Sequence, residues 1–241
     1  MFLAGFPAAD VRGQETVELL VADDHSVKEE VIADDQARIL EYEKLNKHLG
    51  GDSIRNCNGY ACIGWVEDTY PDGTLKHRGY YDQGQLLIYR NYHPDGSLER
   101  DFKVTDNTRA VMRTYHPNGQ MRSEVKYRDG EAYAYEDHYL DGTLRYVEEK
   151  HKSEPYYLRM DLFAADGTPI STLELVDKRN KEFLQREYHP NGTVSLEGRS
   201  RYVPSRYDSM RVGKWVHFDA QGKPVKEESY TEGRVASVRD L

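Results

Sequence analysis

A short phrase that ends in glycine returns at nearly even intervals along most of the chain. The glycines stand at positions 73, 96, 119, 142, 167, 192 and 222. The first three steps are 23 residues each, and the later ones are 25, 25 and 30 residues. Seven copies at such a period predict a row of similar units that bury their surfaces against their neighbours.

The residues around these glycines predict β-hairpins. Asp or Asn precedes the glycine in most copies, and Asp-Gly and Asn-Gly between alternating runs are strong hairpin signals. After Gly119, residues 121–127 alternate between mostly apolar and polar side chains, which is typical of a half-exposed strand. We therefore expect an all-β fold, an elongated and twisted antiparallel sheet of repeated hairpins with about 14 strands.

Two stretches and the C-terminal end depart from the repeat. We expect loops or widened turns at Lys150–Tyr157 and at Arg201–Val212, because proline occurs in both. Gly213-Lys214-Trp215 is predicted to open the last hairpin, and 233–241 to form a short tail. Loops that project from a rigid array are suitable for recognition, although surface insertions are also simply tolerated.

The first 55 residues lack the repeat and are predicted to form a separate acidic segment before a hairpin array over 56–241. They contain 12 acidic and 6 basic residues, a net charge of −6. A strand is predicted at 16–22, and a helix from the capping-box pattern at Ser26 towards Leu49, ended by Gly50-Gly51. We expect this helix to cap the first repeat. Alternatively, its acidic side chains bind a partner: Asp34, Asp35, Glu41 and Glu43.

The charge and composition exclude some classes of partner. A net charge of −9 argues against general binding to nucleic acid or to anionic membranes, and it suits a basic protein. No run of about 20 apolar residues predicts membrane insertion. Met1–Ala9 lacks the charged start of a complete signal peptide, so we expect a cytoplasmic protein, or a periplasmic one if a signal peptide was removed.

Candidate metal and catalytic residues form no convincing site in the sequence. Cys57 and Cys62 suit a disulfide in an oxidising compartment or free thiols in cytosol, and a zinc site would need two more ligands. His93, His116 and His189 occupy the same place in successive turns, which predicts a row of rings stacked at the hairpin ends. A row is poor geometry for catalysis. We expect no enzyme activity, no metal and no cofactor.

The repeated Tyr-x-Pro-Asn/Asp-Gly phrase resembles the MORN-variant repeat. The clearest matches are at 92–98, 115–130, 188–194 and 213–233, and the resemblance covers roughly 65–235. It is most similar to the antitoxins of the YwqK family, which implies a non-enzymatic monomer that neutralises a toxin or secreted effector by one-to-one binding. Tyr156, Tyr157 and Trp215 would be interface anchors. The alternative is a scaffold or envelope-associated MORN-like binding protein.

Overall fold

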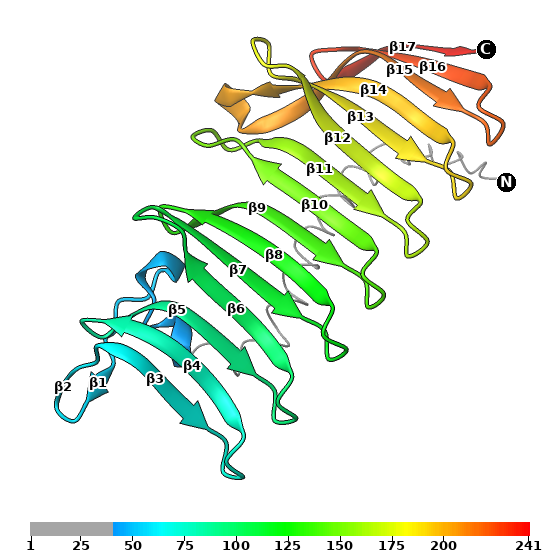
Figure 1. The fold of residues 1–241 in the computed structure, drawn as a ribbon. Coiled ribbons are helices and arrows are strands. Elements are labelled where there is room, and N and C mark those ends of the chain that lie inside the picture. Colours follow the sequence, from blue (N-terminus) through cyan, green and yellow to red (C-terminus); the bar gives the residue numbers. More distant parts are fainter. Residues whose placement is uncertain (1–40) are drawn as a thin grey trace, which may run out of the picture.

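A computed structural model describes residues 41–241, which form an almost entirely β structure (Figure 1). One antiparallel sheet contains 15 strands, and each strand pairs with its neighbours in sequence. The predicted ladder of hairpins is therefore confirmed. The strands are β3 (Gly64–Thr69), β4 (Leu75–Asp82), β5 (Gln85–Tyr92), β6 (Leu98–Val104), β7 (Arg109–Tyr115), β8 (Met121–Arg128), β9 (Glu131–His138), β10 (Leu144–Lys150), β11 (Tyr157–Phe163), β12 (Pro169–Asp177), β13 (Glu182–Tyr188), β14 (Val194–Val203), β15 (Asp208–Phe218), β16 (Pro224–Thr231) and β17 (Arg234–Asp240).

The seven repeated turns lie at the same end of their hairpins, along one long side of the sheet, and share one geometry (Figure 1). In the first, the amide of Gly73 donates to the carbonyl of Tyr70 at 2.9 Å, and the amide of Tyr70 donates to the carbonyl of Thr74 at 2.8 Å. The carboxylate of Asp72 also accepts from the amide of Thr74 at 2.9 Å. This local bond explains why Asp or Asn precedes the glycine, which itself has a φ of 90°.

At the opposite ends of the strands, the connections vary in length. Three are two-residue turns whose central residues both have positive φ, at 83–84, 129–130 and 232–233. The longest regular hairpin is that of β14 and β15, which is closed by a 3₁₀ turn, η2 (Pro204–Arg206). The predicted loop at Arg201–Val212 is therefore wrong outside that turn, because Arg201 pairs with Met210 in the ladder.

The strand pairing also bears on two expectations near the C-terminus. Gly213, Lys214 and Trp215 lie within β15, and the pairing of β15 with β16 begins at Gly213, which faces Tyr230, so this stretch does open the hairpin of β15 and β16. Residues 234–240 form strand β17, which pairs with β16, instead of a free tail. Residues 151–156 do form the expected connection between β10 and β11.

Residues 41–55 pack against one face of the sheet, which we call the inner face. Tyr42 and Leu45 are buried against an apolar cluster from β4 to β6 that includes Tyr81, Tyr89 and Phe102. A short helical turn, η1 (Lys47–Leu49), ends at Gly50 with a φ of 83°. The rest of the predicted helix and the strand predicted at 16–22 lie outside the described residues.

The segment continues into a small hairpin, β1 (Asn56–Cys57) and β2 (Tyr60–Ala61), beside the first strand of the sheet. The other face of the sheet, which we call the outer face, includes Trp65, Tyr80 and Ile88 in one cross-strand row. The inner face thus carries the main core, and the outer face is available to solvent along the array.

Candidate partner-binding site

Two of the repeated histidines link neighbouring hairpins. The imidazole Nε2 of His116 lies 3.0 Å from the carbonyl oxygen of His138, and that of His189 lies 2.9 Å from the carbonyl of Phe218. Tyr139 has the equivalent place in its own turn, and its hydroxyl donates to the carbonyl of Phe163 at 2.9 Å. Stacking of these histidines on their counterparts is therefore not what the structure shows. The rings of His116 and His189 instead bond the strand that precedes the next turn.

Two of the acidic residues predicted to meet a partner are paired with the sheet. Glu41 accepts from Lys76 at 2.8 Å, and Glu43 accepts from Arg100 at 3.1 Å. Arg100 is almost fully buried, so its interaction with Glu43 helps to satisfy a charge on the inner face. Asp34 and Asp35 lie outside the described residues. Glu41 and Glu43 thus hold this segment on the first hairpins.

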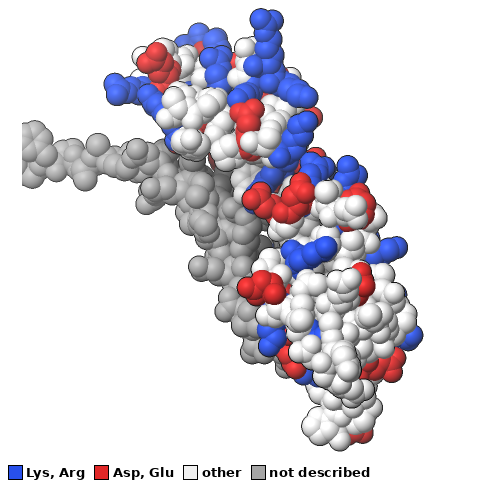
Figure 2. Space-filling model, turned by 90° about the vertical axis from the view of Figure 1, so that its left-hand side faces the viewer, with Lys and Arg blue, Asp and Glu red and all other residues white. Residues whose placement is uncertain are grey.

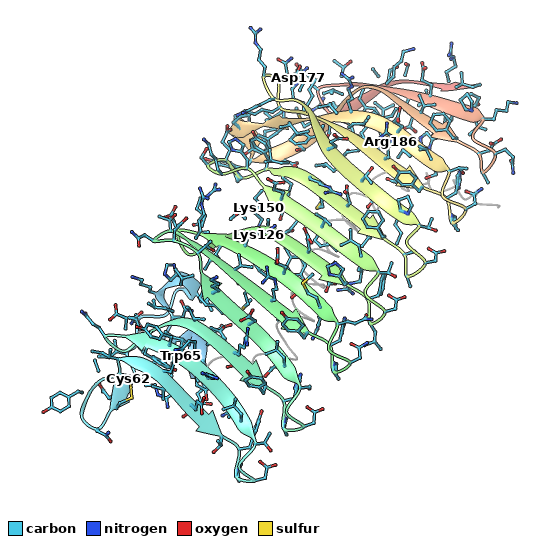
Figure 3. All side chains as sticks on the ribbon, viewed as in Figure 1. Cys62, Trp65, Lys126, Lys150, Asp177 and Arg186 are labelled. Atoms are coloured by element: carbon cyan, nitrogen blue, oxygen red, sulfur yellow. A yellow bond between two sulfur atoms is a disulfide. The ribbon has the colours of Figure 1, made fainter. Side chains whose placement is uncertain are left out.

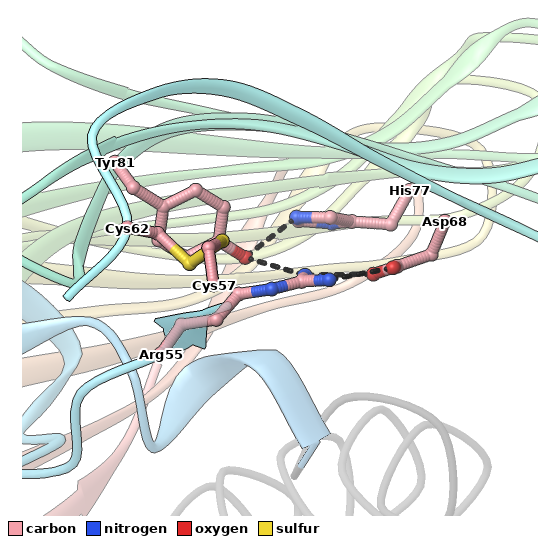
Figure 4. Close-up of a disulfide and its surroundings, with 6 residues drawn as sticks. All are labelled: Arg55, Cys57, Cys62, Asp68, His77 and Tyr81. Carbon is pink, nitrogen blue, oxygen red and sulfur yellow. Dashed lines mark hydrogen bonds and ion pairs between the residues drawn. A yellow bond between two sulfur atoms is a disulfide. The ribbon is translucent and has the colours of Figure 1, made fainter. Parts of the chain in front are cut away.

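A partly buried polar network ties the same segment to the first two strands (Figure 4). Both carboxylate oxygens of Asp68 accept from Arg55, at 2.6 and 2.8 Å, and this pairing lowers the pKa of Asp68. Arg55 also donates to the hydroxyl of Tyr81 at 3.2 Å, which lies 3.0 Å from Nε2 of His77. Nδ1 of His77 is 2.7 Å from the side-chain oxygen of Asn91. Burial lowers the pKa of His77, and the bonds are satisfied by a neutral imidazole in which Nδ1 donates to Asn91 and Nε2 accepts from Tyr81.

A disulfide joins Cys57 to Cys62, so the structure selects one of the two states that the sequence left open. The hairpin that it closes turns at residues 58–59. Beside it lies an exposed apolar surface that we call the terminal patch: Tyr60, Ile63 and Trp65, with 82%, 75% and 55% of their surfaces exposed. Figure 2 shows that the lower end of the molecule, where this hairpin lies, is largely free of charged side chains.

The terminal patch is continuous with a charged outer face. The indole of Trp65 packs edge-on against the ring of Tyr80, with 5.6 Å between the ring centres. The guanidinium of Arg78 lies 5.1 Å from the centre of the Trp65 ring. Further along the array, cross-strand pairs such as Arg113 with Glu124 and Arg186 with Glu197 are each 2.7 Å apart. Figure 3 labels Trp65 and Arg186, which both lie on this face. An apolar anchor with a charged surround is the usual composition of a protein interface.

A second feature is a cavity on the inner face, where the two interruptions of the repeat meet. Residues 155–157 come from the first interruption and residues 202–211 from the second, and both lie against strands β11 to β15. The cavity has a volume of about 240 Å³. Its aromatic walls are Tyr156, Tyr157, Phe183, Tyr202, Tyr207 and Trp215. The three predicted anchors are therefore brought together, since Tyr156, Tyr157 and Trp215 all line it.

Two of these anchors are buried, whereas Tyr157 is partly exposed. Trp215 is only 2% exposed, and its indole N–H donates to the carbonyl of Arg199 at 3.0 Å. Tyr156 is also buried, and its ring contacts those of Phe183 and Tyr202. A partner would reach these rings only through the cavity. Sequence reasoning missed the terminal patch, although apolar residues on either side of Cys62, outside the repeat, were a visible signal.

Two other features are absent from the part of the chain that the structure describes. Within 41–241, no three His, Cys, Asp or Glu side chains are grouped as metal ligands would be. No helix in the same range is long and apolar enough to cross a membrane.

Comparison with solved structures gives only distant likenesses. TarM from S. aureus, in complex with fondaparinux, α-GlcNAc-glycerol and UDP, matches with 9% identity and a TM-score of 0.19 over 61% of this chain and 21% of that chain. A complex titled TcdB2-TccC3-Cdc42 matches with 10% identity and a TM-score of 0.20, over 76% and 14% of the two chains. The chain spans less than a quarter of those proteins. No curated protein matches the sequence.

A family model described as "MORN repeat variant" matches residues 110–129. These residues are strands β7 and β8 with the Asn118-Gly119 turn between them, so the match covers one complete hairpin of the array. The remaining turns repeat its hydrogen bonds. The sheet is therefore an array of β-hairpins that contains a MORN repeat variant.

Proposed function

We propose that the protein is a non-enzymatic antitoxin or immunity protein, which neutralises a toxin or secreted effector by binding it through the terminal patch. The observation that carries this proposal is the exposure of Tyr60, Ile63 and Trp65 beside a disulfide. Rigid aromatic and aliphatic groups lose little entropy on binding, so they are suitable anchors. The likeness of the repeat phrase to that of YwqK-family antitoxins supports the neutralising role.

The charge of the chain suggests the kind of toxin surface that it binds. With a net charge of −9, the protein attracts a basic partner and steers its approach. The paired charges of the outer face then form the rim of the contact around Trp65. We propose a monomer that forms a one-to-one complex, with no role for nucleic acid or membrane insertion.

The disulfide bears on where this binding occurs. Disulfides persist in oxidising compartments and are uncommon in cytosol. The Cys57–Cys62 bond therefore favours the periplasmic placement over the cytoplasmic one. Thiol labelling of protein recovered from fractionated cells distinguishes the two, because a cytoplasmic protein would react at both cysteines without prior reduction.

Two matched substitutions test the binding surface. Ile63→Asp places a carboxylate in the terminal patch, and Leu140→Asp places one on an exposed leucine in a distant turn. We expect Ile63→Asp to weaken binding to the product of the adjacent reading frame by at least about tenfold and to abolish rescue of growth. Leu140→Asp should preserve both, because it adds the same charge elsewhere.

The same assays separate this proposal from a scaffold role. If the neighbouring product neither poisons cells nor copurifies, the antitoxin role is rejected. If it poisons cells and copurifies, but both variants rescue growth equally, the role stands and the terminal patch is rejected. Copurification of envelope proteins or polysaccharide that depends on Ile63, without any toxin, would favour the scaffold alternative.

A further inference from the structure

We propose that the cavity between strands β11 and β15 is a binding site for a small organic carboxylate with an aromatic or branched aliphatic body. This site is separate from the terminal patch and goes beyond the proposed toxin binding. It lies among the copies whose spacing departs from 23 residues, and both interruptions of the repeat contribute walls to it.

The walls suit an apolar body. Phe183 is buried in one cluster with Tyr156 and Tyr202, and Leu173 packs against the same cluster. Met160 adds a flexible side chain that adapts to the shape of a ligand. The volume of about 240 Å³ is slightly below the ~300–1,000 Å³ of usual small-molecule sites, so the ligand must be small.

A cation at the cavity suits a carboxylate. The guanidinium of Arg211 lies 4.0 Å from the centre of the Trp215 ring, and it donates to the hydroxyl of Tyr230 at 3.1 Å. Among the described residues, no carboxylate forms an ion pair with Arg211. A guanidinium has five N–H donors, so most of them remain for an anionic ligand.

A buried hydroxyl provides a second and independent indication. Ser200 lines the cavity and is only 2% exposed, yet its Oγ has no hydrogen-bond partner in the structure. Buried polar atoms are nearly always satisfied, and an exception calls for an explanation. A ligand oxygen in the cavity would supply the missing bond.

Two acidic side chains line the cavity, Glu187 and Asp208. Asp208 accepts from the amide of Ser209 at 2.7 Å, and Glu187 is compatible with an anionic ligand for the following reason. Burial raises the pKa of Glu187, while Arg211 and His217 act in the opposite direction. A carboxyl group with a raised pKa takes up a proton more readily and can then donate to a ligand oxygen. Gln185 adds an uncharged amide to the same wall.

The chain contains a built-in reporter for this site. It has two tryptophans, Trp65 and Trp215, so the full-length Trp65→Phe variant emits from the cavity alone. This variant would be titrated with 3-phenylpropanoate, with the neutral 3-phenylpropanamide and with methyl β-glucoside. We expect a saturable change in Trp215 emission with the carboxylate, weaker binding of the amide and none of the glucoside.

Matched substitutions test whether the charge of Arg211 binds the carboxylate. Arg211→Gln should weaken carboxylate binding at least about tenfold and affect the amide less. Arg206→Gln removes the same charge from the exposed tip of the same hairpin and should leave carboxylate affinity unchanged. Circular dichroism confirms folding of each variant. If Arg211→Gln does not fold, two other variants replace it. Arg211→Lys keeps the charge and should retain part of the carboxylate affinity. Ser200→Val fills the cavity and should abolish carboxylate binding.

Three results would overturn the proposal. The first is unchanged Trp215 emission up to about 10 mM 3-phenylpropanoate, a concentration that would detect even millimolar affinity. The second is equal binding of the carboxylate and the amide with no effect of Arg211→Gln. The third is binding of the glucoside alone, which would assign the cavity to carbohydrate.

Discussion

The indole ring of Trp215 on β15 lies flat against the backbone of Gly198 on β14. A Cβ atom added at position 198 would lie 2.1–2.4 Å from three atoms of this ring. The ring cannot retreat easily, because the guanidinium of Arg211 covers it at 4.0 Å. We therefore expect Gly198→Ala to lower the free energy of unfolding by about 1–3 kcal/mol, measured by urea denaturation.

A double-mutant cycle shows whether the cost arises from this contact. In a Trp215→Leu background, the ring that the new methyl group would meet is absent, so Gly198→Ala should cost much less. Equal costs in the two backgrounds would contradict the steric account and point to the loss of glycine's backbone freedom.

Ser123 and Ser200 form a matched pair of buried hydroxyls, each 2% exposed. The Oγ of Ser123 lies 2.6 Å from Oγ1 of Thr114, whereas the Oγ of Ser200 has no partner. Ser123→Ala should cost about 1 kcal/mol, since it leaves Thr114 unpaired, and Ser200→Ala should be neutral or stabilising. Thermal unfolding of the two variants side by side tests this. A comparable loss in both would show that Ser200 is bonded in the protein.

The sequence predicts the hairpin ladder well because its information is local. Each Asp-Gly or Asn-Gly turn contains its own hydrogen bonds, such as that from the amide of Thr74 to Asp72, so the turn can be recognised from a few adjacent residues. The continuation of β14 and β15 through Arg201–Val212 was missed, because Pro204 marks a turn without showing how far the flanking strands extend.

The sites were harder to predict because they depend on contacts between distant residues. Residue type alone favours Tyr156 and Trp215 as interface anchors, yet pairing across β11 to β15 buries both in one cavity. Likewise, the sequence favours a free acidic face that includes Glu41 and Glu43. In the structure, Lys76 and Arg100 on the sheet form ion pairs with them. Such contacts join residues that are distant in the sequence, so no single turn or strand contains both partners.

Reduction of the Cys57–Cys62 disulfide should loosen the hairpin that supports the terminal patch. The loop that it closes is short, so the chain-entropy model gives about 2 kcal/mol of stabilisation. We expect a reductant to lower the unfolding temperature and to weaken binding of the partner. The double variant Cys57→Ser with Cys62→Ser should resemble the reduced protein and show no response to reductant; a response there would implicate another cause.

His77 should make the protein less stable in weak acid. It is fully buried beneath Tyr42, whose ring stacks on it at 3.7 Å, and burial lowers its pKa from 6.5 to about 4. Between these two values the unfolded chain binds a proton that the folded chain does not. The free energy of unfolding therefore falls as pH falls from about 6.5 to about 4, by on the order of 3 kcal/mol from His77 alone.

Urea denaturation at a series of pH values isolates this contribution. His77→Gln keeps a donor for Asn91 but cannot take up a proton, so its unfolding free energy should depend less on pH across the window. The pH dependence of the wild type should survive in His93→Gln, which alters a histidine in a repeated turn. His48, whose pKa burial also lowers, accounts for part of the slope that remains in His77→Gln. Equal slopes in the wild type and His77→Gln would show that His77 is protonated as readily in the folded state as in the unfolded one.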